Sequence, residues 1–223
     1  MKRSNIDDGF KKNQPAAIET ESSKTILQIL EKRGIRYVDL LDTAMEFYVP
    51  HPGIETTDKA KAVFEREFYF AIGDPNLQML IYAGVLLEQE GEAGELPGVS
   101  RESFEKDLSF IIADEILGDA VADYIAGSKG RFEFVRFDKN KPGILKTLGP
   151  FMDDVIGGLL GGVSANMYSR AMFEFENEKK SAEKKSVGKK SAEKKPVGKK
   201  SAEKKLSLTQ SAPASSQKPG AKK

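Results

Sequence analysis

Acidic residues in three segments of the sequence are of the type that could bind a divalent metal ion. The first segment is Ala113-Asp114-Glu115-Ile116-Leu117-Gly118-Asp119, which continues to Asp123. Glu115, Asp119 and Asp123 are four residues apart, so a helix would place them near one face. A solvated acidic stripe has the same spacing, but this helix is apolar over much of its circumference. We therefore expect at least one of Asp114 and Glu115 at the core boundary, where an unpaired carboxylate costs several kcal/mol.

The other two segments bring acids close to cations or to one another. Arg136-Phe137-Asp138-Lys139-Asn140-Lys141-Pro142-Gly143 predicts a polar turn in which an acid and several cations lie beside a proline. Gly149-Pro150-Phe151-Met152-Asp153-Asp154-Val155-Ile156 predicts two adjacent acids at the start of an apolar helix. Acids at a helix N-terminus interact favourably with the helix dipole, so stability alone can explain the pair. Adjacent helix positions project about 100° apart, however, so one acid can bind a metal while the other supports a neighbour.

The available side chains restrict the chemistry largely to carboxylates and lysines. The 223 residues include no cysteine and one histidine, His51. Disulfides, thiolate zinc sites and cysteine nucleophiles are therefore excluded, as is chemistry that needs two histidines within one chain. A Ser-His-Asp triad could use His51 in principle. Carboxylates are hard oxygen donors, which suit Mg²⁺ or Mn²⁺ better than soft metals.

The formal net charge of +1 conceals two oppositely charged parts. Residues 179–223 hold 15 lysines and 3 glutamates, a formal charge of +12, whereas the other 178 residues hold 20 basic and 31 acidic side chains, a formal charge of −11. From Ser181 the tail repeats Ser-Ala-Glu-Lys-Lys-Ser-Val-Gly-Lys-Lys, which contains no large apolar side chain. Such a composition predicts disorder. The tail either solvates the protein or makes weak electrostatic contacts with an anionic membrane or nucleic acid.

Apolar residues at helical spacing dominate the middle of the chain, so we predict an all-α fold, a single compact helical bundle. We expect a flexible segment at 1–22, the helical domain at 23–178 and the disordered tail at 179–223. We predict helices at 23–33, at 37–48 and at 57–72, the last of these capped by Thr57, and a fourth helix that begins at Pro75 and is capped by Asp74. A loop follows at 91–98, and then an apolar segment at 100–125 that ends in a turn at 127–130. We also predict a short strand at Phe132, Phe134 and Val135 and a last helix at 151–176. We see no signal-peptide core and no apolar run of about 20 residues, so we expect a cytoplasmic location.

Taken in order, the three acidic segments resemble the motifs of the phosphatidylglycerophosphatase A family over residues 23–170. The family's aspartate-glutamate pair in an apolar helix is matched by Asp114-Glu115-Ile116-Leu117-Gly118. Its turn of Asp, Lys and Pro is matched by Asp138-Lys139-Asn140-Lys141-Pro142-Gly143-Ile144. Its hydrophobic-Asp-Asp-hydrophobic helix start is matched by Phe151-Met152-Asp153-Asp154-Val155-Ile156. The stretch 80–85 and the turn 127–130 are similar to soluble members.

The resemblance implies Mg²⁺-type hydrolysis of a phosphomonoester, with Mn²⁺ as an alternative ion. It implies metal and catalytic positions at Glu115, Asp138, Asp153 and Asp154, with Lys141 as the partner of the phosphate. Because we expect no membrane-spanning helix, the soluble relatives indicate a small phosphorylated substrate, α-ribazole-5′-phosphate, and a role in cobalamin nucleotide-loop synthesis. One alternative is phosphatidylglycerophosphate hydrolysis, with the tail on anionic lipid. Another is a non-catalytic nucleic-acid-binding protein that acts through the tail and does not require these acids.

Overall fold

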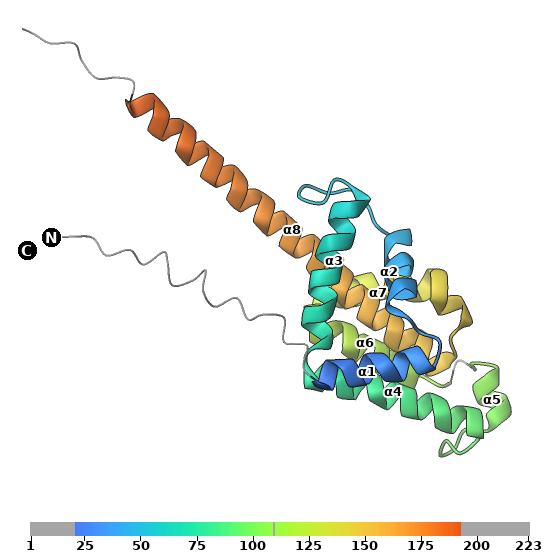
Figure 1. Ribbon diagram of the computed structural model, residues 1–223. Coiled ribbons are helices and arrows are strands. Elements are labelled where there is room, and N and C mark those ends of the chain that lie inside the picture. Colours follow the sequence, from blue (N-terminus) through green and yellow to red (C-terminus); the bar gives the residue numbers. More distant parts are fainter. Residues whose placement is uncertain (1–20, 109, 193–223) are drawn as a thin grey trace, which may run out of the picture. The chain divides into compact units, whose positions relative to one another are not determined.

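A computed structural model describes residues 21–108 and 110–192, which form helices joined by loops (Figure 1). The predicted all-α fold is confirmed, because these described residues contain no strand beyond an isolated bridge between His51 and Ile54. In chain order the helices are α1 (Glu21–Lys32), α2 (Tyr37–Glu46), α3 (Thr57–Ile72), α4 (Pro75–Ala93), α5 (Arg101–Glu105), α6 (Ala113–Ala126), α7 (Ser128–Asn140), the 3-10 helix η1 (Gly143–Thr147) and α8 (Pro150–Ala192).

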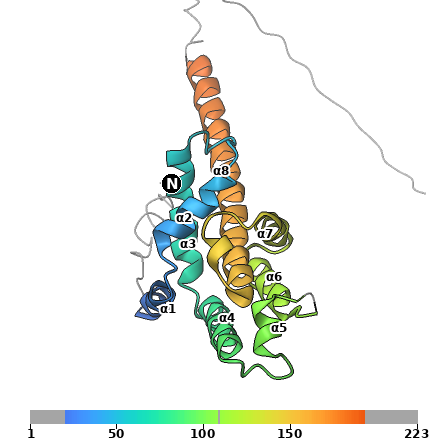
Figure 2. The same ribbon diagram turned by 90° about the vertical axis from the view of Figure 1, so that its right-hand side faces the viewer.

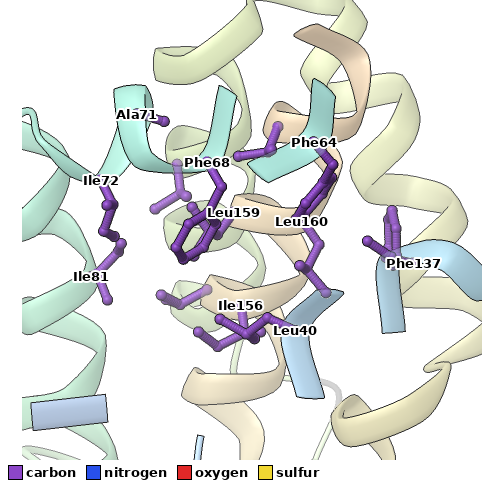
Figure 3. Close-up of a cluster of buried hydrophobic side chains, with 14 of the residues drawn as sticks. Leu40, Phe64, Phe68, Ala71, Ile72, Ile81, Phe137, Ile156, Leu159 and Leu160 are labelled. Atoms are coloured by element: carbon purple, nitrogen blue, oxygen red, sulfur yellow. The ribbon is translucent and has the colours of Figure 1, made fainter. Parts of the chain in front are cut away.

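The first part of α8 is the centre of the hydrophobic core. It belongs to the compact unit Met1–Ser181, in which the other helices pack around it (Figures 1 and 2). Side chains from α2, α3, α4 and α7 converge on Ile156, Leu159 and Leu160 of α8 (Figure 3). They include Leu40, Phe64, Phe68, Ile81 and Phe137, all fully buried. Burying one such side chain stabilises the fold by about 1.5–3 kcal/mol, so this core holds the first part of α8 against the other helices.

Local signals define several helix ends as predicted. Asp74 caps α4, since its Oδ1 accepts a hydrogen bond of 2.7 Å from the Asn76 N–H, and Pro75 occupies the first helical position. Gly94 ends α4 with a left-handed φ of 81°, so the predicted loop at 91–98 begins later than Gly91. The predicted cap of α3 is wrong by one residue, because Thr56 rather than Thr57 accepts from the Lys59 N–H.

The predicted strand at Phe132, Phe134 and Val135 is wrong, because these residues lie in α7. Phe134 and Phe137 are buried three residues apart, whereas Phe132 and Val135 are exposed, which is the pattern of a half-buried helix. The strand preference of aromatic and β-branched residues is weak and yields to packing. The polar turn predicted at 136–143 is correspondingly shorter, since residues 136–140 continue α7.

The predicted apolar segment at 100–125 is not one element. It divides into α5 and α6, and Asp107 between them has a left-handed φ of 46°, which a helix cannot accommodate. The turn predicted at 127–130 is reduced to Gly127, because α7 begins at Ser128. The acidic pair of residues 114 and 115 therefore lies in the first turn of a helix rather than within a long one.

The last helix continues to Ala192 instead of ending at Glu176, so residues 179–192 of the predicted tail are helical. Ala, Glu and Lys favour helix, and Lys180 Nζ lies 3.9 Å from a Glu176 carboxylate oxygen one turn away. The remaining parts of the predicted terminal segments, 1–20 and 193–223, lie outside the described residues. Residues Ala182–Lys223 count as a separate unit.

No single described helix has the length and apolar composition of a membrane span. Only α3 and α4 taken together, bent by 86° at the break between them, meet that test.

Candidate metal centre

The first turn of α6 supplies one acid to the candidate centre. The expectation that this acidic pair reaches the core boundary is confirmed by Asp114, which is 3% exposed, while Glu115 is exposed. Asp114 Oδ1 accepts a 2.8 Å hydrogen bond from the Glu115 N–H. Asp119 instead forms an ion pair of 2.7 Å with Arg131, and Asp123 is exposed. Of the predicted stripe, only Glu115 joins acids from other helices.

The end of α7 supplies a second acid and a cation. Asp138 is half-buried in the last turn, and Lys141 follows as the C-cap with a left-handed φ of 42°. Thr43 of α2, 1% exposed, holds the turn that follows. Its Oγ1 accepts a 3.0 Å hydrogen bond from the Ile144 N–H and donates one of 2.6 Å to the Asp39 carbonyl. This contact fixes the backbone immediately after Lys141.

The start of α8 supplies Asp153 and Asp154. Glu88 of α4, itself buried, accepts hydrogen bonds from the backbone N–H groups of Phe151 at 2.9 Å and Met152 at 3.2 Å. It thereby satisfies two of the N–H groups that a helix start leaves unpaired. Burial raises the pKa of the Glu88 carboxyl. The position of the two aspartates thus depends on an acid 65 residues upstream of Asp153.

Two glycines bring α6 and α8 into close contact. A Cβ atom on Gly158 would overlap the Gly118 carbonyl, and a Cβ atom on Gly118 would lie 2.6 Å from the Asp154 carbonyl oxygen. Only glycine allows the two backbones this approach. As a result, Glu115, one turn before Gly118, lies close to Asp154.

Three of the four carboxylates surround one ammonium group, and the fourth, Glu115, lies close to two of those three. Carboxylate oxygens of Glu115, Asp138 and Asp154 all lie within 4.8 Å of one another. The Lys141 Nζ lies 2.8 Å from Asp153 Oδ2, 3.0 Å from Asp138 Oδ1 and 3.2 Å from Asp154 Oδ1. The structure therefore brings together all five predicted site residues, with Asp153 joined to the others through Lys141.

Burial and neighbouring charges together raise the pKa values of Glu115, Lys141, Asp153 and Asp154. Burial raises the pKa of Asp154, and the charge of Asp153 raises it further, while Lys141 opposes both. Burial also raises the pKa of Asp153 against the effect of Lys141. Partial desolvation and the charge of Asp138 raise the pKa of Glu115. Burial alone would lower the pKa of Lys141, but Asp153, Asp138 and Asp154 together raise it. Negative charge exceeds positive charge in the cluster, which favours a further cation.

The donor set fits a hard divalent ion. Mg²⁺ binds oxygen at about 2.0–2.1 Å, so two ligands on opposite sides of one ion are about 4.2 Å apart. The oxygens of Glu115, Asp138 and Asp154 lie within 4.8 Å of one another and would have to draw closer around an ion, because neighbouring oxygens of an octahedral Mg²⁺ are about 2.9 Å apart. The three acids come from three different helices, so the core holds their positions.

Sequence reasoning did not identify the supporting residues Thr43 and Glu88. Glu88 offered a weak signal, since an acid in the apolar helix α4 must find a partner. Thr43 offered none, because its contact with Ile144 joins residues 101 positions apart.

The chain belongs to a protein family that has an archaeal member. That relative is the uncharacterized protein MJ1330 of Methanocaldococcus jannaschii, which is 33% identical over 132 residues, 57% of this chain and 99% of the relative. The uncharacterized protein YutG of Bacillus subtilis (strain 168) is 27% identical over 153 residues, 64% of this chain and 87% of YutG. No family model matches the sequence.

The same fold occurs in a solved bacterial structure. A protein of unknown function from Bacillus stearothermophilus superposes with a TM-score of 0.57, at 23% identity, over 67% of this chain and 99% of that one. At this identity the likeness establishes a common fold.

Proposed function

We propose that this chain is a divalent-metal-dependent phosphomonoester hydrolase and that its substrate is α-ribazole-5′-phosphate. The observation that supports the reaction most strongly is the convergence of Glu115, Asp138 and Asp154, whose oxygens lie within 4.8 Å of one another. Hard carboxylate ligands favour Mg²⁺, with Mn²⁺ as the alternative. The resemblance of the three acidic motifs to the phosphatidylglycerophosphatase A family supports the same reaction class.

Each side chain has a defined role in this proposal. Glu115, Asp138 and Asp154 would hold the ion, which when bound polarises a phosphoryl oxygen and activates water. Lys141 neutralises negative charge on the phosphoryl group, and Asp153, 2.8 Å from its Nζ, orients it. Hydrolysis joins the water oxygen to phosphorus and breaks the ester P–O bond, so that the products are inorganic phosphate and an alcohol.

A second candidate substrate is phosphatidylglycerophosphate. Phe110, Ile112 and Ile116 are 60%, 59% and 62% exposed, and they flank Glu115 in the sequence. Exposed apolar side chains beside a polar site suit a substrate with acyl chains. Tail lysines near an anionic lipid surface can each contribute about 1 kcal/mol to binding.

A side-by-side assay separates the two substrates. Phosphate release is measured from α-ribazole-5′-phosphate and from phosphatidylglycerophosphate in mixed micelles, each with Mg²⁺, with Mn²⁺ and with a chelator. We expect metal-dependent release from α-ribazole-5′-phosphate, and Ile112→Ser with Ile116→Ser should leave that rate unchanged. Faster release from the lipid, reduced by the same two substitutions, would favour the second candidate. No release from either substrate with either metal would refute the proposed function.

A further inference from the structure

The ammonium group of Lys141 lies where the candidate ligands converge. Its Nζ is 3.0 Å from Asp138 Oδ1 and 3.2 Å from Asp154 Oδ1, and these two acids are also members of the three-carboxylate group. Lys141 therefore uses the same acids that a metal ion would use.

Lys141 adopts a backbone conformation that is unusual for a lysine. Lys141 has a φ of 42°, the left-handed conformation in which glycine usually ends a helix. A residue with a Cβ atom is strained there. The position nevertheless holds a lysine whose Nζ contacts three carboxylates, at distances of 2.8 to 3.2 Å. The strain is offset by the charge that the side chain brings to the acids.

The Lys141 side chain can also move away from the carboxylates into solvent. Lys141 is 32% exposed, in contrast to 4% for Asp154 and 12% for Asp153. A lysine carries its charge on a flexible four-carbon stem, so the ammonium can move while Cα stays in place. A divalent ion between Asp138 and Asp154 would repel a nearby ammonium more strongly than one unit charge repels another.

We propose that Lys141 is a built-in counter-ion, which a divalent metal ion displaces from Asp138 and Asp154. The inference rests on the proposed function and adds a regulation of the same site, namely that the ammonium and the metal compete. Without metal, the lysine keeps the buried acids paired. When metal binds, the ammonium leaves those two acids and becomes available to the phosphate of the substrate.

The affinity of full-length, metal-stripped protein for Mn²⁺ tests the competition. The variants are Lys141→Met, which keeps the apolar stem, and Lys141→Gly, which suits the left-handed backbone and guards against misfolding of the first. Lys139→Met is the matched control, since Lys139 is exposed and forms no ion pair within the described residues. We expect both Lys141 variants to bind Mn²⁺ about tenfold tighter or more, and the control to stay within about twofold. Unchanged or weaker binding in both Lys141 variants would overturn the proposal.

A second measurement uses the unaltered protein. The rate at which acetic anhydride labels Lys141 is followed by peptide mass spectrometry with and without Mg²⁺, with Lys139 as the internal reference. We expect Mg²⁺ to increase labelling of Lys141 several-fold relative to Lys139; an unchanged or reduced rate contradicts displacement. If the parent protein binds neither ion, the proposed function itself fails, whereas metal binding without tightening in the Lys141 variants refutes only the competition.

Discussion

At the scale of single residues, Asp154 is the most deeply buried of the four candidate metal-binding acids. Its carboxylate is 3% exposed, and burial raises its pKa. A buried charge of this kind destabilises the fold unless a cation compensates it. Among the described ion pairs, Asp154 has one partner of opposite charge, Lys141. Its negative charge is therefore available to a second cation.

We predict that Asp154→Asn and Asp153→Asn lower turnover by about a hundredfold or more, while the helical circular dichroism signal stays close to that of the parent. Asparagine keeps the size of the side chain but loses the charge on which the metal and Lys141 depend. The same reasoning applies to Glu115→Gln and Asp138→Asn. If Glu115, Asp153 and Asp154 merely stabilised helix starts, their loss would cost about 0.3–1 kcal/mol of stability and leave turnover intact.

The matched control for these variants is Asp119→Asn. Asp119 lies one turn after Glu115 on α6, but it pairs with Arg131 at 2.7 Å. The substitution removes an exposed ion pair, which contributes about 0–1 kcal/mol, and turnover should be unaffected. A large loss of turnover in this control, equal to that of Asp154→Asn, would show that general negative charge rather than the site is responsible.

Metal affinity should fall as the pH is lowered from about pH 8 to about pH 6. The pKa values of Asp154, Asp153 and Glu115 are all raised by burial or partial desolvation, so these groups take up protons at higher pH than ordinary carboxyls do. A protonated carboxyl cannot bind the metal, and each bound proton must leave first. Mn²⁺ titrations at three pH values check this, and a pH-independent affinity would contradict it.

The sequence could single out the five candidate site residues, which the structure brings together, because each belongs to a recognisable motif of acids, lysine and proline. It could not identify Glu88 and Thr43, whose hydrogen bonds join residues 63 and 101 positions apart. Contacts over such distances depend on the packing of α2 and α4, which local patterns do not encode. Residue types therefore indicate the candidate site residues better than the residues that support them.

At the scale of elements, the crossing of α6 and α8 at Gly118 and Gly158 determines whether Glu115 and Asp154 meet. We predict that Gly158→Ala destabilises the protein by about 1–3 kcal/mol, because the added methyl group would overlap the Gly118 carbonyl. Separation of the helices should also weaken Mn²⁺ binding. Thermal unfolding and metal titration measure the two effects.

The control for that substitution is Gly73→Ala. Gly73 ends α3 with a φ of −71°, and a Cβ atom there would lie 3.3 Å from its nearest neighbour, so the strain should be smaller. If Gly158→Ala were as stable as Gly73→Ala and bound Mn²⁺ equally well, the close helix crossing would not be what positions the acids.

Element boundaries were predicted well where an N-cap marks them, as at Asp74, but α4 ends at Gly94 rather than before Gly91, where the predicted loop begins. They were predicted poorly in α7, where Phe132 and Val135 suggested a strand although Phe134 and Phe137 pack against the core. This difference matters for the site, because Asp138 and Lys141 belong to a helix end rather than to a free turn. Whether residues 132–135 form a helix or a strand depends on their packing against α8, which a single sequence does not reveal directly.

At the scale of the whole molecule, the compact unit Met1–Ser181 contains all five candidate site residues. We predict that truncation after Ser181 leaves the thermal midpoint and the hydrolysis of a soluble substrate unchanged. The removed lysine-rich repeat has no large apolar side chains that could contribute to the core. Loss of activity toward a soluble substrate in a truncated protein that still folds would contradict this.

The all-α class could be predicted from hydrophobic periodicity, because a long helical pattern remains recognisable even when the predicted ends of the helix are wrong by a few residues. The length of α8 could not, since the lysine-rich repeat was expected to be disordered whereas residues up to Ala192 are helical. Residues 181–184 are exposed although they are helical, so a helix can form here without burial in the core.

The most direct test of the central claim is phosphate release from α-ribazole-5′-phosphate by exhaustively chelated protein to which Mg²⁺ is then added. The site described above predicts no measurable turnover without metal and recovery as Mg²⁺ is titrated in. It further predicts that Asp154→Asn fails to recover at the concentration that saturates the parent protein. Full turnover by the chelated parent, or equal recovery of Asp154→Asn, would show that Glu115, Asp138 and Asp154 do not form the metal centre of a phosphatase.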